Sequence, residues 1–218
     1  MKTVHLESPI EGLHASRPEP LSFAPSLHIR SFLLRRARGN VLIYAAPGFD
    51  AAAPDVGALG GVSRWYLNHR HEAGFAPDHV DAPLFVHEAE WRSVESHRHV
   101  RGTFSRRHVL DEDFEVIPIP GHTRGATAYL WDSGRHRFLF TGDTIYLADG
   151  EWTTAVLDSS DRTAYAASLE LIRELEFDVL VPWAATAGRP FHAVTSARDA
   201  RRRIDALLAR IRNGDRAG

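Results

Sequence analysis

The chain has 218 residues and a mass of 24.3 kDa, a length that suits one domain or two halves that share a core. Lys+Arg is 26 against Asp+Glu 28, so the net charge of -2 offers no basic surface for nucleic acid. Cysteine is absent, which excludes disulfides, thiolate metal sites and cysteine nucleophiles. Any metal must therefore be held by His, Asp or Glu, and the 13 histidines favour metal or proton chemistry.

The first stretch of the chain carries no targeting signal. Residues 1–30 contain no apolar run long enough for a signal peptide or a membrane span. We therefore expect a cytoplasmic protein without a membrane partner. The oligomeric state has no signature in the sequence.

Strand patterns dominate the first half, after a proline-containing segment, about 1–26, that is expected to be irregular. Residues 28–35 and 41–45 flank the turn signal Arg38-Gly39-Asn40, which predicts a hairpin. Two further short strands are expected at 64–68 and 84–87.

The second half combines strands with two helices. The run 114–119 alternates and stops at Pro120-Gly121, and a second hairpin is expected around Asp132-Ser133-Gly134. Apolar residues at helical spacing predict helices over 161–176 and 195–213, with a short buried strand at 179–181 between them. We expect a single domain over residues 1–218 with mixed β-structure covered by helices.

Three polar motifs each follow a predicted strand. The first contains His69 and His71, the second is Pro120-Gly121-His122-Thr123, and the third is Thr141-Gly142-Asp143-Thr144. Strand ends are where scaffolds display functional groups, and neutral imidazole is a good zinc ligand. Each motif alone also fits a solvated loop, so their order along the chain carries the interpretation.

Together the motifs resemble the metallo-β-lactamase fold superfamily, in particular its glyoxalase II-like and general metallo-hydrolase branches. The resemblance runs from about residue 28 to residue 194 and includes the early strand 40–48 and the strand-to-helix step 84–91. It implies an α+β fold, a four-layer αββα sandwich of two similar halves. It also implies that His69, His71 and His122 hold a metal ion and that Asp143 lies where the family's bridging carboxylate stands.

The sequence departs from this family at the second metal position. The family's H-x-H-x-D-H motif reads His69-Arg70-His71-Glu72-Ala73-Gly74, so neither Ala73 nor Gly74 can bind a metal. The family's last histidine falls at Ala184, and the acidic residue that often ends the early hairpin is Tyr44. Only Asp143 remains, and a single protein ligand is too few to hold a second ion.

The remaining ligands predict a mononuclear centre. Three imidazoles with Asp143 or water suit tetrahedral Zn(II), while two histidines and Asp143 would suit iron, as in the family's persulfide dioxygenases. Asp143 is the candidate catalytic base, with Glu72 and His192 as further candidates to replace the missing groups. His97 and His99 form another H-x-H, but their polar, helix-like surroundings indicate a solvated face.

Three functions are therefore open. The first is a metal-dependent hydrolase of a small ester, thioester or lactone-like substrate. The second is a catalytically inactive ligand-binding or partner-binding scaffold that lacks a dinuclear centre and binds metal weakly or not at all. The third, which the sequence favours least, is a mononuclear iron dioxygenase. We expect a small-molecule substrate or ligand, whose identity the sequence does not reveal.

Overall fold

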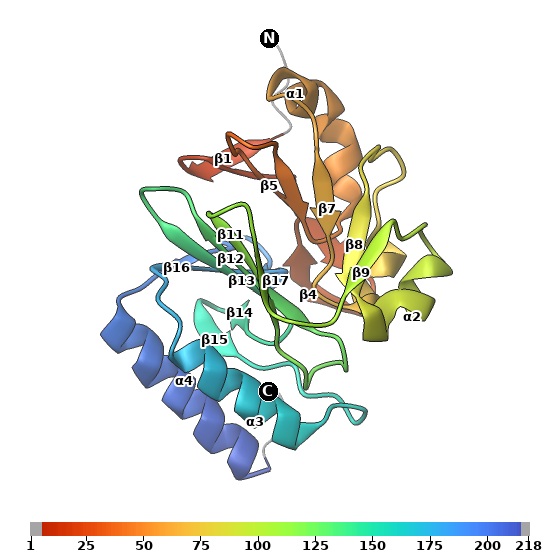
Figure 1. Ribbon diagram of the computed structural model, residues 1–218. Helices are drawn as coiled ribbons and strands as arrows, with labels where there is room; N and C mark the ends of the chain where they lie inside the picture. The colour runs from red at the N-terminus through yellow and green to blue at the C-terminus, as the bar shows by residue number, and fades with distance from the viewer. Residues whose placement is uncertain (1–5, 215–218) are drawn as a thin grey trace. The chain divides into compact units, whose positions relative to one another are not determined.

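The computed structural model describes residues 6–214 and divides the chain into two compact units, Met1–Phe104 and Ser105–Gly218 (Figure 1). Each unit combines strands with helices, which confirms the expected α+β class. Whether the two units act as a single domain stays a prediction.

The first unit is built on a seven-stranded sheet in the order β1-β2-β5-β6-β7-β8-β9. The strands from β1 to β6 pair antiparallel, and β6 to β9 pair parallel. The predicted hairpin is confirmed as β5 and β6. The strand bounds are β1 Glu7–Ile10, β2 Leu13–Ala15, β5 Phe32–Leu34, β6 Val41–Ile43, β7 Arg64–Tyr66, β8 Leu84–His87 and β9 Gly102–Phe104.

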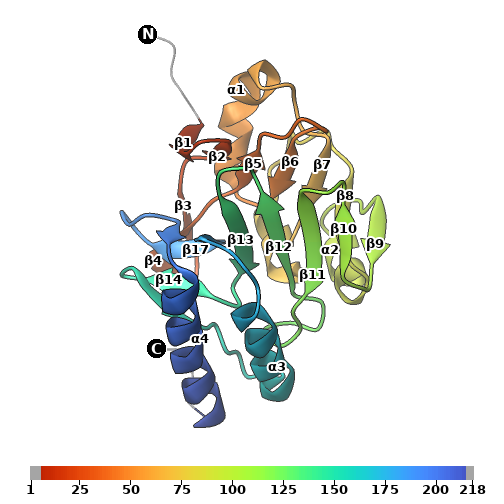
Figure 2. The ribbon, with the colours of Figure 1, turned by 60° about the vertical axis from the view of Figure 1, so that its left-hand side comes forward.

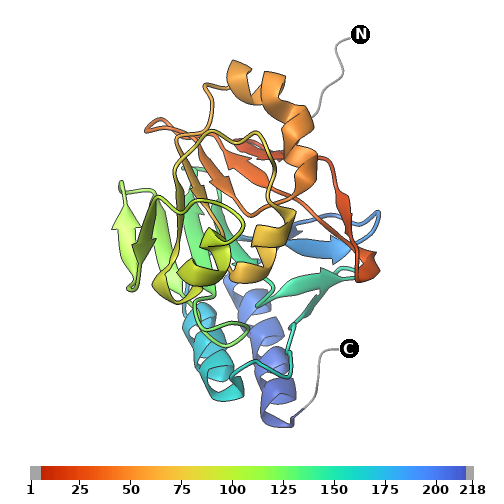
Figure 3. The same ribbon diagram turned by 90° about the vertical axis from the view of Figure 1, so that its right-hand side faces the viewer.

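One face of this sheet forms the core of the first unit. Leu42 pairs with Leu33 on one side and with Trp65 on the other, and all three are buried. Short helices cover this face, as the orange segments in Figure 3 show, and Phe49 and Val56 from them join the same apolar cluster. The helices are η1 Pro47–Ala52, α1 Ala53–Ala58, η2 Arg70–Phe75, η3 Glu88–Glu90 and α2 Trp91–Glu95.

The expectation of an irregular segment over about 1–26 is wrong for its described part. Strands β1 and β2 extend the large sheet, and β3 (Glu19–Leu21) pairs antiparallel with β4 (Ala24–Ile29). These strands are short and interrupted by prolines, so their own alternation is weak. Pairing with distant strands supplies the hydrogen bonds that local sequence does not predict.

The second unit is built on a six-stranded sheet in the order β10-β11-β12-β13-β16-β18, of which Figure 2 labels β10 to β13. The second predicted hairpin is confirmed as β12 and β13. Because β11 and β13 both pair antiparallel with β12, and β16 pairs parallel with β13, the strands β11, β13 and β16 end at one edge. The bounds are β10 His108–Leu110, β11 Phe114–Pro118, β12 Thr127–Asp132, β13 Arg137–Gly142, β16 Val179–Pro182 and β18 Ala193–Val194.

The two long helices of the second unit confirm the predicted helical segments. Helix α3 (Arg162–Arg173) is capped by Asp161, and α4 (Ala197–Arg212) is capped by Ser196. They lie side by side in Figures 2 and 3. The unit also contains β14 (Tyr146–Ala148), which pairs with β15 (Glu151–Thr153) and β17 (Ala184–Thr186). Within residues 6–214, every helix is too short or too polar to cross a bilayer.

Candidate functional site

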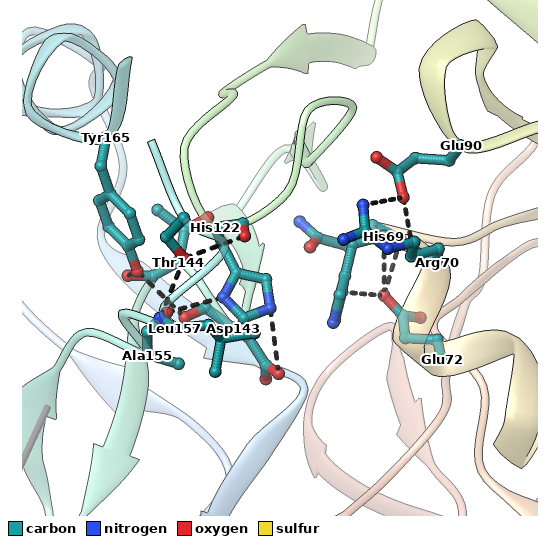
Figure 4. Close-up of polar contacts among 12 residues, drawn as sticks. His69, Arg70, Glu72, Glu90, His122, Asp143, Thr144, Ala155, Leu157 and Tyr165 are labelled. Carbon is teal, nitrogen blue, oxygen red and sulfur yellow. Dashed lines mark hydrogen bonds and ion pairs between the residues drawn. The ribbon is translucent and has the colours of Figure 1, made fainter. Parts of the chain in front are cut away.

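The histidine pair of the first unit lies in the turn after β7. His69 is the N-cap residue of η2, and the Oε1 atom of Glu72 accepts hydrogen bonds from the backbone N–H groups of Asn68, at 2.8 Å, and His69, at 3.1 Å. The same oxygen lies 3.1 Å from Nδ1 of His69 (Figure 4). Both side chains are fully buried. Because Nδ1 contacts the carboxylate, Nε2 is the ring nitrogen that would bind a metal.

A second buried carboxylate holds the other side of this turn. Glu90, at the end of η3, accepts a hydrogen bond from the backbone N–H of Arg70 at 2.9 Å and lies 3.7 Å from the Arg70 guanidinium (Figure 4). Buried carboxylates are stable only when they are paired or hydrogen-bonded, and Glu72 and Glu90 both are. They fix the backbone of the histidine turn.

His71 lies beside His69 on the same turn. The two rings meet edge to face, with centroids 4.9 Å apart and an angle of 90° between the ring planes. The structure therefore brings together the two histidines of the first motif. His71 is half-buried, whereas His69 is buried.

The two positions that lack the family's ligands lie in η2 but differ in environment. Ala73 is buried and belongs to the apolar cluster of the first unit. Gly74 is exposed, and a Cβ at this position would meet no atom within 4 Å. At the end of the early hairpin, Tyr44 is buried and has a φ of 67°, a left-handed conformation that is uncommon for a side chain of this size.

The second unit displays His122 in the turn that follows β11. Its Nδ1 lies 2.7 Å from the backbone carbonyl oxygen of Ala155, and its Nε2 lies 3.8 Å from Oδ2 of Asp143 (Figure 4). The side chain is 2% exposed. Contact between Nδ1 and a carbonyl again leaves Nε2 for a metal. In both His69 and His122, Nδ1 therefore contacts an oxygen acceptor and Nε2 is the candidate ligand atom.

Asp143 follows β13, at the same sheet edge as His122. The preceding Gly142 has a φ of 56°, and the Asp143 side chain is 17% exposed. Burial, reinforced by the charge of Asp143, raises the pKa of Tyr165 well above its ordinary value and raises that of Tyr146 as well. Both tyrosines therefore stay protonated near the carboxylate at neutral pH.

The other candidate positions lie elsewhere in the second unit. Ala184, where the family places its last histidine, begins β17 and is buried. His192 precedes β18, and burial lowers its pKa. Within residues 6–214, His192 belongs to no group of three or more potential metal ligands.

The second H-x-H of the first unit is a surface feature, as expected. His99 is 81% exposed and lies 3.0 Å from Glu95, and His97 contacts the carbonyl oxygen of Ser93 at 3.1 Å. Both pairings are local contacts around α2, so nothing directs these two side chains toward a common ion.

Sequence reasoning missed the groups that hold the histidines. The sequence offers Glu72 as a candidate to replace a missing group, but the structure places it against His69. Its position three residues after the N-cap is a capping-box signal. The Ala155 carbonyl left no signal because a backbone group carries none. Tyr165 fitted the apolar stripe of a helix, so its hydroxyl was not expected to contact the Asp143 turn.

Comparison with known proteins identifies the family. A family model described as the metallo-beta-lactamase superfamily matches residues 54–184, more than half of the chain. The chain therefore belongs to the metallo-β-lactamase superfamily. Members of this superfamily typically bind metal ions, usually zinc.

Two curated relatives match shorter segments. A hydroxyacylglutathione hydrolase of Erwinia tasmaniensis is 35% identical over 82 residues, which make up 37% of this chain and 31% of that protein. Another, of Xanthomonas axonopodis pv. citri, is 40% identical over 53 residues, 24% of this chain and 19% of that protein. Both matches span well under half of each relative, so they support a metallo-hydrolase family without a particular substrate.

Solved structures confirm the fold. A metallo-β-lactamase from Hirschia baltica has a TM-score of 0.70 at 14% identity and covers 95% of this chain and 98% of its own. A metallo-β-lactamase from Pontibacter korlensis also has a TM-score of 0.70 at 14% identity and covers 95% of this chain and 99% of its own. At these identities the likeness establishes the metallo-β-lactamase fold alone.

Proposed function

We propose that the protein is a mononuclear metal-dependent hydrolase of a small ester, thioester or lactone-like substrate. The observation that carries the proposal is the matched orientation of His69 and His122. Each has its Nδ1 against an acceptor of its own unit, Glu72 Oε1 at 3.1 Å and the Ala155 carbonyl at 2.7 Å. This arrangement is typical of metal-ligating histidines and directs Nε2 to the ion.

The donor set fits zinc. His69 and His71 from the first unit and His122 from the second are the proposed protein ligands, with Asp143 or water as the fourth. Three neutral imidazoles and one oxygen suit a tetrahedral Zn(II) site, although iron accepts a related set. When bound, zinc lowers the pKa of coordinated water to about 7 and polarises a substrate carbonyl.

A second ion has no comparable set. Ala73 and Ala184 are buried apolar residues, and Gly74 has no side chain. Asp143 alone would remain to hold a second metal, and one ligand is insufficient. The proposal is therefore for one metal ion per chain.

Asp143 is the proposed general base. Its carboxylate is partly exposed, so it is accessible to water, and Oδ2 lies 3.8 Å from His122 Nε2. A carboxylate at this position can accept a proton from the attacking water and return it to the leaving group. Ala73 stands where the family has an Asp. Asp143 is therefore the acidic side chain that remains at a position matched by the family resemblance.

The substrate class rests on the family and on the curated relatives. Their name denotes hydrolysis of an acyl-glutathione, which is a thioester, and this agrees with an ester or thioester as substrate. We further propose that the substrate is a small molecule and that the protein is cytoplasmic.

Turnover of a panel of small esters, thioesters and lactones tests the proposal, with the protein loaded with one equivalent of zinc. We expect hydrolysis of at least one member, a loss of at least ~100-fold in His122→Ala, and retention in His99→Ala, whose side chain is exposed. Hydrolysis that survives in His122→Ala would contradict the assignment.

A catalytically inactive binding scaffold is the second candidate. Ala73 favours it, because this position has become part of the apolar core rather than a polar site. A scaffold predicts no turnover of any panel member by the zinc-loaded wild type.

A further inference from the structure

The hydroxyl of Tyr165 lies against the turn that carries Asp143. It donates a hydrogen bond to the carbonyl oxygen of Thr144 at 2.7 Å and lies 3.3 Å from the carbonyl oxygen of Asp143 (Figure 4). Tyr165 belongs to α3, and its side chain is completely buried. A buried hydroxyl in this place fixes the backbone of the Asp143 turn, because removal of a buried hydrogen-bond donor is costly.

The backbone of Ala155 links the same hydroxyl to His122. Its N–H donates a hydrogen bond to the Asp143 carbonyl oxygen at 3.3 Å, and the Tyr165 hydroxyl lies 3.3 Å from that same oxygen. Its carbonyl oxygen accepts from Nδ1 of His122 at 2.7 Å. One peptide residue therefore connects the Tyr165 hydroxyl to the orientation of the imidazole.

The helix that carries Tyr165 packs directly on the turn before His122. A Cβ at Gly121 would lie 2.4 Å from the Cα of Tyr165, so only glycine permits this approach. On the same helix, the Ser168 hydroxyl donates to the Pro120 carbonyl oxygen at 2.6 Å. The position of Tyr165 relative to the His122 turn is thus set by the backbone.

We propose that Tyr165 is a positioning residue, whose hydroxyl holds His122 in its Nδ1–H form and keeps Asp143 beside it. The inference deepens the proposed function, on which its metal-binding consequence rests. Tyr165 does not touch a substrate or a metal in this account. It acts through Ala155 on one ligand and through the Asp143 and Thr144 carbonyls on the other.

The first test examines the metal-free protein and so does not depend on the proposed function. Long-range ¹H–¹⁵N spectra report which nitrogen of His122 carries the proton, with the signal assigned by its loss in His122→Ala. We expect the Nδ1–H form to dominate in the wild type and in the control Tyr129→Phe. Tyr129 is an equally buried tyrosine, in β12, that stacks on Phe114. In Tyr165→Phe we expect a mixture of both tautomers.

The second test measures zinc affinity by competition with a chromophoric chelator. Loss of a group that orients a metal ligand typically weakens binding by ~10–100-fold, and we expect this for Tyr165→Phe but not for Tyr129→Phe. Incorporation of 4-aminophenylalanine at position 165, which restores a donor, should restore the affinity. If Tyr165→Phe does not fold, 4-fluorophenylalanine at this position fills the space without donating a hydrogen bond.

The outcomes separate the two proposals. An unchanged His122 tautomer together with unchanged zinc affinity in a folded variant without the hydroxyl would overturn the role of Tyr165. If the His122 tautomer changes in Tyr165→Phe but the wild type binds no zinc, the positioning role would be supported and the proposed metal centre contradicted.

Discussion

The Nδ1 atom of His69 lies 3.1 Å from Oε1 of Glu72, and both side chains are fully buried. The two residues are the N-cap and the N3 positions of the same short helix, so a local capping arrangement also orients a candidate metal ligand. The same carboxylate therefore caps the helix and contacts the ring of a candidate metal ligand.

Glu72→Gln should weaken zinc binding. The substitution keeps the shape of the side chain but removes the charge that makes the Nδ1 contact strong and the imidazole a better ligand. We expect the Kd for zinc to rise by ~10–100-fold, measured by chelator competition.

Glu90→Gln is the matched control for Glu72→Gln. Glu90 is also buried, and its carboxylate accepts a hydrogen bond from the backbone N–H of Arg70. We expect this variant to lose stability with little change in zinc affinity. Equal losses of affinity in both variants would show that the turn, and not the Glu72–His69 contact, determines binding.

Gly121→Ala should strongly destabilise the protein. The φ of +142° is strained for alanine, and the new methyl would lie 2.4 Å from the Tyr165 backbone, which cannot move without its helix. We expect a loss of more than ~3 kcal/mol in the free energy of unfolding, measured with urea.

Gly134→Ala provides the comparison for the backbone strain alone. Gly134 has a φ of +81°, but a Cβ there would meet nothing within 4 Å. We expect this variant to lose only ~1–2 kcal/mol. A loss of similar size at Gly121 would mean that the helix and the His122 turn are not closely packed.

The hairpins and long helices could be predicted because their signals are local. The turn at residues 38–40 separates two compact apolar runs, and the apolar positions of α4 recur at helical spacing around a clear N-cap, Ser196. The strands β1 to β3 could not be predicted in this way. Their pairing comes from partners elsewhere in the chain, and their prolines suggested irregular structure.

The candidate ligands were predictable, but the groups that orient them were not. His69, His122 and Asp143 follow strands in a recognisable order. The acceptor for His122 is a backbone carbonyl 33 residues further along the chain, and such a contact leaves no mark in the sequence. Tyr165 fits the apolar stripe of α3, and this stripe does not indicate that its hydroxyl donates to the Thr144 carbonyl oxygen.

Restoring the family's ligands at the second metal position should lower the free energy of unfolding by different amounts at the two positions. Ala73→Asp would place a carboxylate in the apolar cluster of the first unit, and a buried charge without a partner is strongly destabilising. Gly74→His enters open space. We expect a loss of at least ~2 kcal/mol for the first and less than ~1 kcal/mol for the second in urea unfolding. Similar stabilities would show that Ala73 is free to become polar.

Asp199 should make stability depend on acid pH. The guanidinium groups of Arg202 and Arg203 lower its pKa from 3.8 to about 2. The folded value lies below the unfolded one, so this contribution is present above pH 3.8 and is lost as the pH falls toward 2. Because these pairs are partly exposed to solvent, we expect Asp199→Asn to lower Tm at neutral pH by no more than ~4 °C.

The difference in Tm between Asp199→Asn and the wild type should become smaller as the pH is lowered from 5 to 2.5. Asp81→Asn, at an exposed position, is the control and should follow the wild type throughout. A difference in Tm that stays constant over this range would contradict the role given to the Asp199 carboxylate.

The metal content of the untagged protein, purified without added metal or chelator, tests the central claim most directly. Mass spectrometry should find about one zinc per chain, and the His69→Ala/His122→Ala double variant should contain none while remaining folded. About one iron per chain would favour the dioxygenase instead. Folded wild-type protein without metal, or with about two ions per chain, would contradict a mononuclear hydrolase.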